Sequence, residues 1–372
     1  MQVYLDSHST TPVDPRVLDA MLPLFRDRPG NASSLDHAAG RRTKEAVEAA
    51  RRQVAAVIGA SHKDIVFTSG ATEADNLAIK GVAEAARDRG AHIVTVATEH
   101  RAVLDTCRHL EARGWRLTVL PVDADGLIDL AALDAAIRPD TVLVSVMAAN
   151  NEIGVLQPLA TIGRLTRARG VLFHTDAAQA FGRIPLDVGA LYVRTRQPTV
   201  RLAPLFAGGG HERGLRPGTL NAPGIVGLGT AAALAAADLA AESIRLAALR
   251  DRLLAGLRAA LDGVHVNGSL EHRLPHNLNV SIDGTDETLA SRLDGLAVSA
   301  GSACASGSIE PSYVLRALGV PASQAHGTLR FGLSRFTTEA EIERAIAIVR
   351  DGVERLRAER LARPRPAAST SS

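Results

Sequence analysis

Short apolar runs of strand length alternate with longer segments of helical periodicity through the first half of the chain. The segment 102–112, for example, repeats its apolar positions at helical spacing between two such runs. Strands that alternate with helices predict an α/β fold with a mainly parallel sheet, which binds ligands at the carboxyl ends of its strands. The expected strands are 65–68, 92–96, 117–120, 141–146 and 171–173.

The second half of the chain predicts a smaller, separate unit. An Ala-rich segment at roughly 224–261 is expected to form a helix long enough to bridge two domains, and 277–282 alternates as a strand with one buried face. We therefore expect a large α/β domain, a small α+β domain that joins the chain ends, and a disordered tail rich in Pro and Ser. Their bounds are 15–240 for the large domain, 1–14 with 241–362 for the small domain, and 363–372 for the tail.

Composition excludes several classes of partner. The chain has 372 residues, 46% of them hydrophobic, which is enough for a substantial core. Its 42 basic and 40 acidic residues give a net charge of +2, and thus no electrostatic case for nucleic acid or an anionic membrane. We expect no apolar run to approach the roughly 20 residues of a membrane span. Two cysteines, and an N-terminus without a basic-then-apolar segment, predict a cytoplasmic protein.

Polar motifs follow several of the expected strands. The segment 69–72, SGAT, begins a helix whose free N–H groups and Thr72 hydroxyl can hold a phosphate, although a plain helix cap has the same local pattern. His100 and Asn151 follow later strands, where each fits a structural role as well as a catalytic or cofactor-binding one. Asp176 places a carboxylate at the ligand-binding edge of the sheet.

The two thiols occur in opposite contexts. Cys107 shares helical spacing with Val103 and Leu110, so we expect it in the core. Cys304 lies in a segment of small residues with nothing bulky to bury it, which predicts an exposed, reactive thiol. The glycine-rich segment 208–219 is expected to be a mobile or phosphate-approaching loop rather than a core element.

Six motifs resemble, in this order, those of the cysteine desulfurases, which are pyridoxal-phosphate enzymes of the fold-type I, class V aminotransferase-like group. The motifs are SGATEADN, TEH, NNEIG, HTDAAQAFGRIPLD, GGGHERGLRPGT and SAGSACASG. The resemblance covers nearly the whole chain. It implies a large domain with a mixed, mainly parallel sheet, a smaller α+β domain, no metal, and a homodimer whose active sites lie near the interface.

The resemblance also assigns the cofactor-binding side chains. Ala71 and Thr72 correspond to the phosphate-binding helix start, and Thr219 to a residue offered to the cofactor phosphate of the other subunit. His100 corresponds to a catalytic histidine that stacks on the pyridine ring and takes part in proton transfer.

Three further residues correspond to contacts around the ring. Asn151 corresponds to an amide near the ring, Asp176 to the carboxylate paired with the protonated ring nitrogen, and Gln179 to the donor to the phenolic oxygen. The pairing with Asp176 matters most, because a cationic ring is the electron sink that stabilises a substrate carbanion.

The remaining correspondences concern the substrate, L-cysteine. Asn31 and Arg330 correspond to the pair that holds the substrate carboxylate, in which the arginine supplies a bidentate fork. Cys304 corresponds to the nucleophile that takes the substrate sulfur as a persulfide and leaves alanine. The sulfur then passes to an acceptor or scaffold protein.

The chain departs from the family pattern at one place. Members carry a further core strand and then a Ser-x-His-Lys motif whose lysine forms a Schiff base with the cofactor, whereas here Val188 is followed directly by Gly189. The lysines of this chain match no such motif; they are Lys44, Lys63 and Lys80. We therefore expect pyridoxal phosphate to bind without a covalent bond and the rate to fall severely. We also expect the sheet either to re-pair, with 189–193 in the vacant strand position, or to be left with a gap, and the cost of unpaired buried backbone favours re-pairing.

The sequence thus predicts a cysteine desulfurase homologue of impaired activity that serves iron–sulfur or thio-modification pathways. A non-catalytic sulfur-relay or interaction protein that keeps Cys304 and works with an active desulfurase is the alternative. An aminotransferase or lyase of the same fold would leave the Cys304 segment unexplained. A truncated gene product would give the same junction at 188/189.

Overall fold

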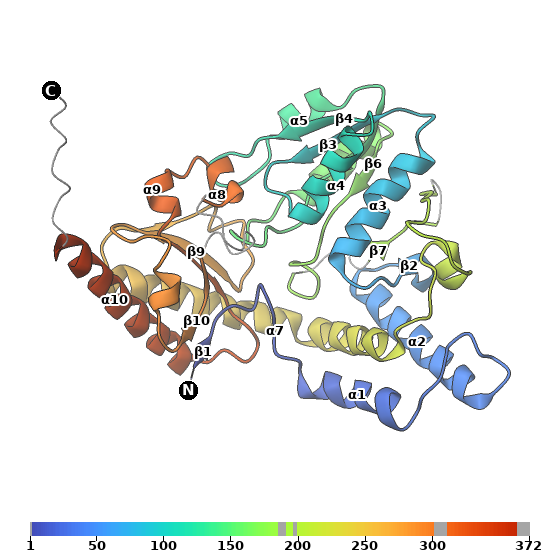
Figure 1. Cartoon of the computed structure of the whole chain (residues 1–372), viewed down its shortest axis with the longest axis horizontal. Coiled ribbons are helices and arrows are strands. Elements are labelled where there is room, and N and C mark those ends of the chain that lie inside the picture. The colour runs from blue at the N-terminus through green and yellow to red at the C-terminus, as the bar shows by residue number, and fades with distance from the viewer. Residues whose placement is uncertain (1, 185–190, 196–198, 301–310, 363–372) are drawn as a thin grey trace, which may run out of the picture.

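The computed structural model describes residues 2–184, 191–195, 199–300 and 311–362. Figure 1 shows a large and a small domain joined by one long helix. The large domain contains a four-stranded parallel sheet in the order β4-β3-β5-β6, which confirms the expected mainly parallel arrangement. The strands are β3 (His92–Val96), β4 (Arg116–Leu120), β5 (Thr141–Ser145) and β6 (Leu172–His174). The helices around this sheet are α3 (Ala71–Ala85), α4 (Arg101–Glu111), α5 (Leu130–Ala136) and α6 (Leu159–Ala168).

Helices cover both faces of this sheet, which explains its continuous apolar strands. Ile93 of β3 packs in one cluster with Ile79 of α3, whereas its neighbour Val94 packs in another cluster with Ile162 of α6. Cys107 lies in the first cluster with 1% of its surface exposed, so the expected core thiol is confirmed. Burial raises the pKa of this thiol to about 12, which makes it unreactive near neutral pH.

A second, two-stranded piece of sheet lies beside the first. Its strands, β2 (Ile65–Val66) and β7 (Leu191–Tyr192), run antiparallel and pair Ile65 with Tyr192. Within the described ranges β6 pairs with β5 alone and β7 with β2 alone. The expected re-pairing of 189–193 into the vacant position beside β6 was therefore wrong for its described part. All three residues of β6 are half-buried, whereas every residue of β5 is buried, as befits a strand at an open edge.

The small domain is built on an antiparallel sheet in the order β11-β12-β9-β8, beside a parallel pair of β1 and β10. Val3 and Leu5 share its core with residues from Leu246 to Leu356, so the N-terminus belongs to the same packing unit as the C-terminal third. The strands are β1 (Val3–Tyr4), β8 (Val264–Val266), β9 (Asn277–Ile282), β10 (Leu296–Ala297), β11 (Ser299–Ala300) and β12 (Thr328–Gly332). The helices here are η3 (Ala290–Arg292), α8 (Tyr313–Ala317), α9 (Ala322–Ala325) and α10 (Glu339–Ala362).

Helix α7 (Ala222–Ala260) joins the two domains, and the domain boundary expected at 240/241 falls inside it (Figure 1). By length and mean hydropathy alone α7 is long and apolar enough to cross a membrane, so the expectation that no apolar run approaches a membrane span was wrong. Its small residues serve packing: Gly227 lies against Met21, and Gly229 against Ala50, in places where a methyl group would collide. These contacts come from α1 (Pro15–Arg26) and α2 (Ala38–Val57).

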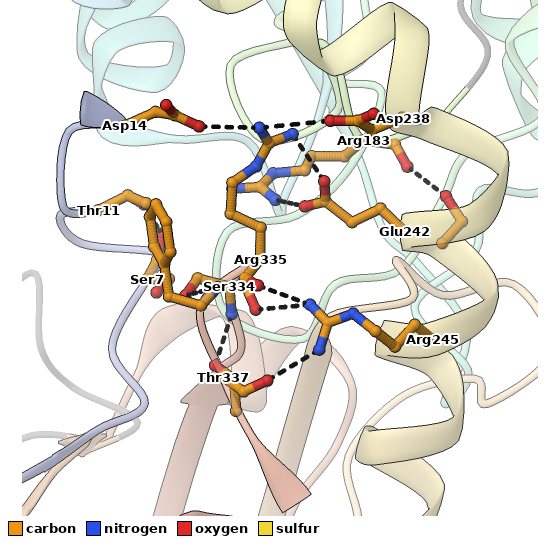
Figure 2. A network of polar contacts seen from close by, with 12 residues as sticks. Ser7, Thr11, Asp14, Arg183, Asp238, Glu242, Arg245, Ser334, Arg335 and Thr337 are labelled. Carbon is orange, nitrogen blue, oxygen red and sulfur yellow. Dashed lines mark hydrogen bonds and ion pairs between the residues drawn. The ribbon is translucent and has the colours of Figure 1, made fainter. Parts of the chain in front are cut away.

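Figure 2 shows a network of charged side chains where the two domains meet. Arg335, which follows β12, donates to Asp14 at the start of α1 (3.2 Å) and to Glu242 of α7 (2.7 Å). Glu242 also accepts from Arg183 (3.1 Å), which ends the segment that carries Asp176. The network therefore connects the small domain, α1, α7 and the segment that carries Asp176.

Candidate cofactor and active site

Asp176 follows β6 directly and lies at the carboxyl end of the parallel sheet. Its backbone carbonyl accepts from the Ala148 N–H (2.8 Å), and its side-chain Oδ1 accepts from the Ala178 N–H (2.9 Å). Burial, followed by the charge of Asp75, raises the pKa of the Asp176 carboxyl. The position expected from sequence is thus occupied by a fixed, nearly buried carboxyl group.

A cationic ring would fit this site. Glu99 is fully buried, and its pKa is raised well above the ordinary value by burial and by the charges of Asp176 and Asp75. The Oδ2 atom of Asp75 and the Oε2 atom of Glu99 have no hydrogen-bond partner. Three carboxyl groups in low-dielectric surroundings favour a nearby positive charge. The protonated nitrogen of a pyridine ring over Asp176 would supply it.

His100 lies close to Asp176, and Gln179 follows it by three residues in the chain. His100 caps α4, and its Nδ1 atom accepts from the Ala102 N–H (3.1 Å), which leaves the ring proton on Nε2. The charge that His100 can carry acts on Asp176, so the two side chains lie close together. Gln179 is half-buried, and its amide forms hydrogen bonds with His8. No local sequence pattern points to a role for His8 at this site.

The phosphate side of the site is formed by the start of α3. Gly70 precedes the helix, no side chain caps it, and a methyl group at Gly70 would meet no atom within 4 Å. Ala71 and Thr72 are exposed. Free N–H groups at the positive end of a 15-residue helix form a suitable cradle for a phosphate. The structure therefore fits the expected phosphate position, and Thr219 is exposed as an outward-reaching residue would be.

Glu73 holds this turn in place, a role the sequence interpretation missed. It accepts from the N–H (2.8 Å) and the hydroxyl (2.5 Å) of Ser69 and from Arg216 (2.8 Å). Arg216 lowers the pKa of Glu73 to about 2, with help from Ser69. An acidic residue four positions after a serine at a helix start was the available signal.

The glycine-rich segment is better anchored than we expected. Glu212, which adopts a left-handed φ of 49° inside η2 (His211–Gly214), is buried and forms a bidentate pair with Arg51 of α2, at 2.7 Å for both bonds. The same carboxylate accepts from the Phe67 N–H (2.8 Å) just after β2. The expectation that no part of 208–219 belongs to the core was therefore wrong at Glu212.

The expected substrate residues are not brought together within one chain. Arg330 is buried, and its Nη2 atom donates to Asp6 (2.9 Å), Ser9 (2.7 Å) and Ser299 (3.0 Å). Its Nη1 atom donates to the backbone carbonyl of Asn151 (3.1 Å). The loop between α1 and α2, which carries Asn31, lies at the far end of the large domain from the small-domain sheet (Figure 1). Asn151, rather than Asn31, is thus the neighbour of Arg330.

Cys304 and the 188/189 junction lie outside the described residues. Beyond 301–310 the chain is fixed by Ser312, whose hydroxyl donates to Glu152 (2.5 Å). Burial raises the pKa of Glu152 to about 7.

The three lysines are all described. Lys44 and Lys63 are exposed, the first on α2 and the second in η1 (His62–Asp64), at the opposite end of β2 from the phosphate turn. Lys80 lies nine residues into α3, about 13 Å along the axis from the helix start.

Comparison with known proteins agrees with this geometry. The Aminotransferase class-V family model matches residues 3–194 and 188–345. The chain is 54% identical to a cysteine desulfurase IscS of Anaeromyxobacter sp. (strain K), over 95% of this chain and 93% of that protein. It is 50% identical to a mitochondrial cysteine desulfurase of Arabidopsis thaliana, over 95% and 83%.

Solved structures give the same assignment. A NifS-like protein, 35% identical, superposes with a TM-score of 0.87 over 95% of this chain and all of that one. A structure described as SspA in complex with cysteine is 32% identical, with a TM-score of 0.79 over 91% of this chain and all of that one.

The comparison also shows a difference in length. The alignment with the Anaeromyxobacter protein spans 377 positions, more than the 372 residues of this whole chain. The relative therefore has residues within the aligned span for which this chain has none. The identity over nearly the full length, the family match and the fold together place the chain among the cysteine desulfurases, pyridoxal-phosphate-dependent sulfurtransferases of the class-V aminotransferase family.

Proposed function

We propose that this protein binds pyridoxal phosphate without a covalent bond to a lysine and acts slowly on L-cysteine, with Cys304 as the sulfur acceptor. The observation that carries the proposal is the buried Asp176 at the carboxyl end of the sheet, close enough to His100 and to Asp75 of α3 for their charges to act on its pKa, together with the uncapped start of α3. When bound, the cofactor supplies an electron sink. Asp176 would hold the ring proton, Gln179 would donate to the phenolic oxygen, and α3 would hold the phosphate.

The sulfur transfer needs one nucleophile and one proton. The thiolate of Cys304 attacks the substrate sulfur, so that a sulfur–sulfur bond forms while the carbon–sulfur bond of L-cysteine breaks. The electron pair left on carbon takes up a proton, which gives alanine and a persulfide. We assign the supply of that proton to His100, because its Nδ1 atom accepts from the Ala102 N–H and the ring proton is therefore on Nε2. The structure described as SspA in complex with cysteine supports this choice of substrate.

The rate should be low because a general acid–base group is missing. Such a group typically contributes about 10²–10⁴-fold to a rate. Lys80 is the one lysine on a helix of the site, and it lies far from the end that would hold the phosphate. The protein should therefore turn over far more slowly than a desulfurase that carries the lysine.

We propose that the protein is a homodimer. Leu18, Leu22 and Phe25 follow one another at i, i+4 and i+7 along α1, and they are 44%, 44% and 65% exposed. Leu228 of α7, the helix against which α1 packs, is 39% exposed. An exposed apolar stripe of this kind is typical of an interface. A second copy could also bring Asn31 and Thr219 to a site, and light scattering should show a dimer that Leu22→Glu weakens.

We also propose a cytoplasmic location, because the two cysteines cannot form a disulfide framework. The resemblance to cysteine desulfurases supports a sulfur-acceptor or scaffold protein from an iron–sulfur or thio-modification pathway as the partner. A direct pull-down of candidate acceptors with persulfide-loaded protein would test this. Transfer of labelled sulfur to none of them would contradict it.

The test of the activity uses purified protein, pyridoxal phosphate and L-cysteine, with alanine and the mass of Cys304 as readouts. We expect slow alanine release together with a persulfide on Cys304, and neither product from Asp176→Asn. A Cys304→Ser variant should lose the persulfide. A persulfide that forms only after an active desulfurase is added would favour a relay protein and contradict the proposed activity.

A further inference from the structure

His8 lies in the segment between β1 and α1 and is 7% exposed. Its Nδ1 atom is 2.9 Å from Oε1 of Gln179, and its backbone carbonyl accepts from Nε2 of the same glutamine (3.3 Å). Its Nε2 atom is 3.0 Å from Nδ2 of Asn277 in β9. One buried histidine therefore connects a small-domain strand to a side chain of the candidate cofactor site.

The direction of these bonds can be worked out from the far end. Arg273, which can only donate, bonds to Oδ1 of Asn277 (3.0 Å), so the other end of that amide is the nitrogen. The Asn277 nitrogen donates to Nε2 of His8, which must then be without a proton. The proton of His8 is thus on Nδ1 and donates to Oε1 of Gln179. The series of hydrogen bonds that starts at Arg273 therefore determines the orientation of the Asn277 amide and the tautomer of His8.

The surroundings of His8 favour the neutral form of its ring, which this series of hydrogen bonds requires. Burial lowers the pKa of His8 to about 4, the positive charges of Arg330 and Arg183 also lower it, and the hydrogen bond that His8 donates to Gln179 acts in the opposite direction. The ring packs against His276, with 4.7 Å between centroids. Gly332 of β12 lies so close to His8 that a methyl group on this glycine would collide with the ring. The ring is therefore fixed in position as well as in protonation.

We propose that His8 is a positioning residue that holds the amide of Gln179 with its nitrogen available to the phenolic oxygen of the cofactor, an inference that rests on the proposed function. Because Oε1 of Gln179 accepts from His8, Nε2 is the end left to donate. One hydrogen of Nε2 bonds to the His8 carbonyl, and the second remains for a ligand. Without His8 the Gln179 amide could rotate and place Oε1, which cannot donate, against the phenolic oxygen of the cofactor.

The test compares the binding of pyridoxal phosphate with that of 3-deoxypyridoxal phosphate, which lacks the phenolic oxygen, by fluorescence titration. His8→Phe keeps the ring but removes both nitrogens, and Gln179→Leu removes the proposed donor. We expect each variant to bind pyridoxal phosphate about fivefold to tenfold more weakly, as the loss of one hydrogen bond implies. The double variant should be no weaker than either single one, because the two residues act in series. Binding of the deoxy analogue should not change.

The outcomes separate the two claims. If Gln179→Leu does not weaken the binding of pyridoxal phosphate, the proposed cofactor contact is wrong, and the inference about His8 is wrong with it. The proposed function stands and the inference fails if Gln179→Leu weakens the binding of pyridoxal phosphate but His8→Phe does not. The same conclusion follows if His8→Phe weakens the binding of both ligands equally. His8→Asn, which retains an N–H near the Nδ1 position, should restore binding.

A measurement on the unaltered protein does not depend on whether a variant folds. Nitrogen NMR of histidine-labelled protein should show His8 as a neutral ring protonated on Nδ1. A ring protonated on Nε2 alone would overturn the inference.

Discussion

The ring side and the phosphate side of the site are built differently. On the ring side, Asp176, His8 and Glu99 are nearly buried, and their partners come from both domains. On the phosphate side, Ala71 and Thr72 are exposed, and the turn is held mainly by its neighbour Glu73. Preorganised, buried groups act more strongly than solvated ones. The ring side should therefore account for most of the cofactor affinity that remains without a lysine.

The pKa values of the carboxyl groups on the two sides are shifted in opposite directions, because one side is buried and the other is paired near solvent. Burial raises the pKa values of Asp176, Glu99 and Glu152. Glu73 is near solvent and is paired with Arg216, which lowers its pKa. The comparison therefore makes predictions about pH as well as about affinity.

Loss of the ring-nitrogen partner should have the largest effect. Asp176→Asn removes the charge that keeps a bound ring protonated, and we expect cofactor affinity to fall by about 10–100-fold, the usual cost of a charged hydrogen bond. Titration with pyridoxal phosphate measures this change. Asp125→Asn, at an exposed aspartate, is the matched control and should leave binding unchanged. Equal affinity of Asp176→Asn and the native protein for pyridoxal phosphate would contradict the claim that the ring side accounts for most of the cofactor affinity.

Glu152, whose backbone carbonyl accepts from the same Asn277 amide that donates to His8, should make folding less favourable as the pH rises. Its pKa is about 7 in the folded state and near 4.5 when unfolded, so the folded state binds more protons between these values. We expect a loss of up to about 3 kcal/mol across that window, since each pKa unit corresponds to about 1.4 kcal/mol. Urea unfolding of the native protein and of Glu152→Gln at pH 4.5 and pH 7.5 tests this. A constant difference between the two would contradict it.

On the phosphate side, Glu73 should have the opposite effect. Its folded pKa of about 2 lies below the unfolded value, so its stabilisation is complete above about pH 4.5 and disappears as the pH falls toward 2. Nearby solvent screens the pair with Arg216, so we expect about 1 kcal/mol. Glu73→Gln should therefore lose less stability than the native protein between pH 5 and pH 3. A larger loss of stability in Glu73→Gln than in the native protein would contradict a stabilising role for the ionised Glu73.

The phosphate-contact hydroxyl should have the smallest effect. Thr72→Ala leaves the backbone N–H groups of α3 intact, and the exposed hydroxyl should contribute about 0.5–1 kcal/mol to the binding of the cofactor phosphate. A pyridoxal phosphate titration should show an increase in Kd of about threefold. An effect as large as that of Asp176→Asn would mean that the two sides do not differ.

The sequence predicted the local parts of this molecule well. Apolar periodicity located the parallel strands and the buried Cys107, because those features depend on neighbouring residues. Residues at the ends of strands, such as Asp176 and His100, were located because parallel strands meet at one edge.

Contacts between distant segments could not be predicted. His8 and Gln179 are 171 positions apart, and Arg51 and Glu212 are 161 apart, so no local pattern connects them. The position of Asn31 relative to Arg330 depends on how the α1–α2 loop leaves the large domain. The re-pairing of the sheet failed as a prediction because β7 had a partner in β2, which a comparison of neighbouring segments does not reveal.

The most direct test of the account is borohydride reduction of the protein loaded with pyridoxal phosphate, followed by denaturation and mass measurement. If the cofactor is bound without a lysine, its absorbance spectrum should depend on Asp176, and all of it should be released from the denatured chain. Asp176→Asn protein, treated in parallel, measures nonspecific labelling of Lys44, Lys63 and Lys80. A phosphopyridoxyl group fixed to one lysine of the native protein, and absent from that control, would contradict the account.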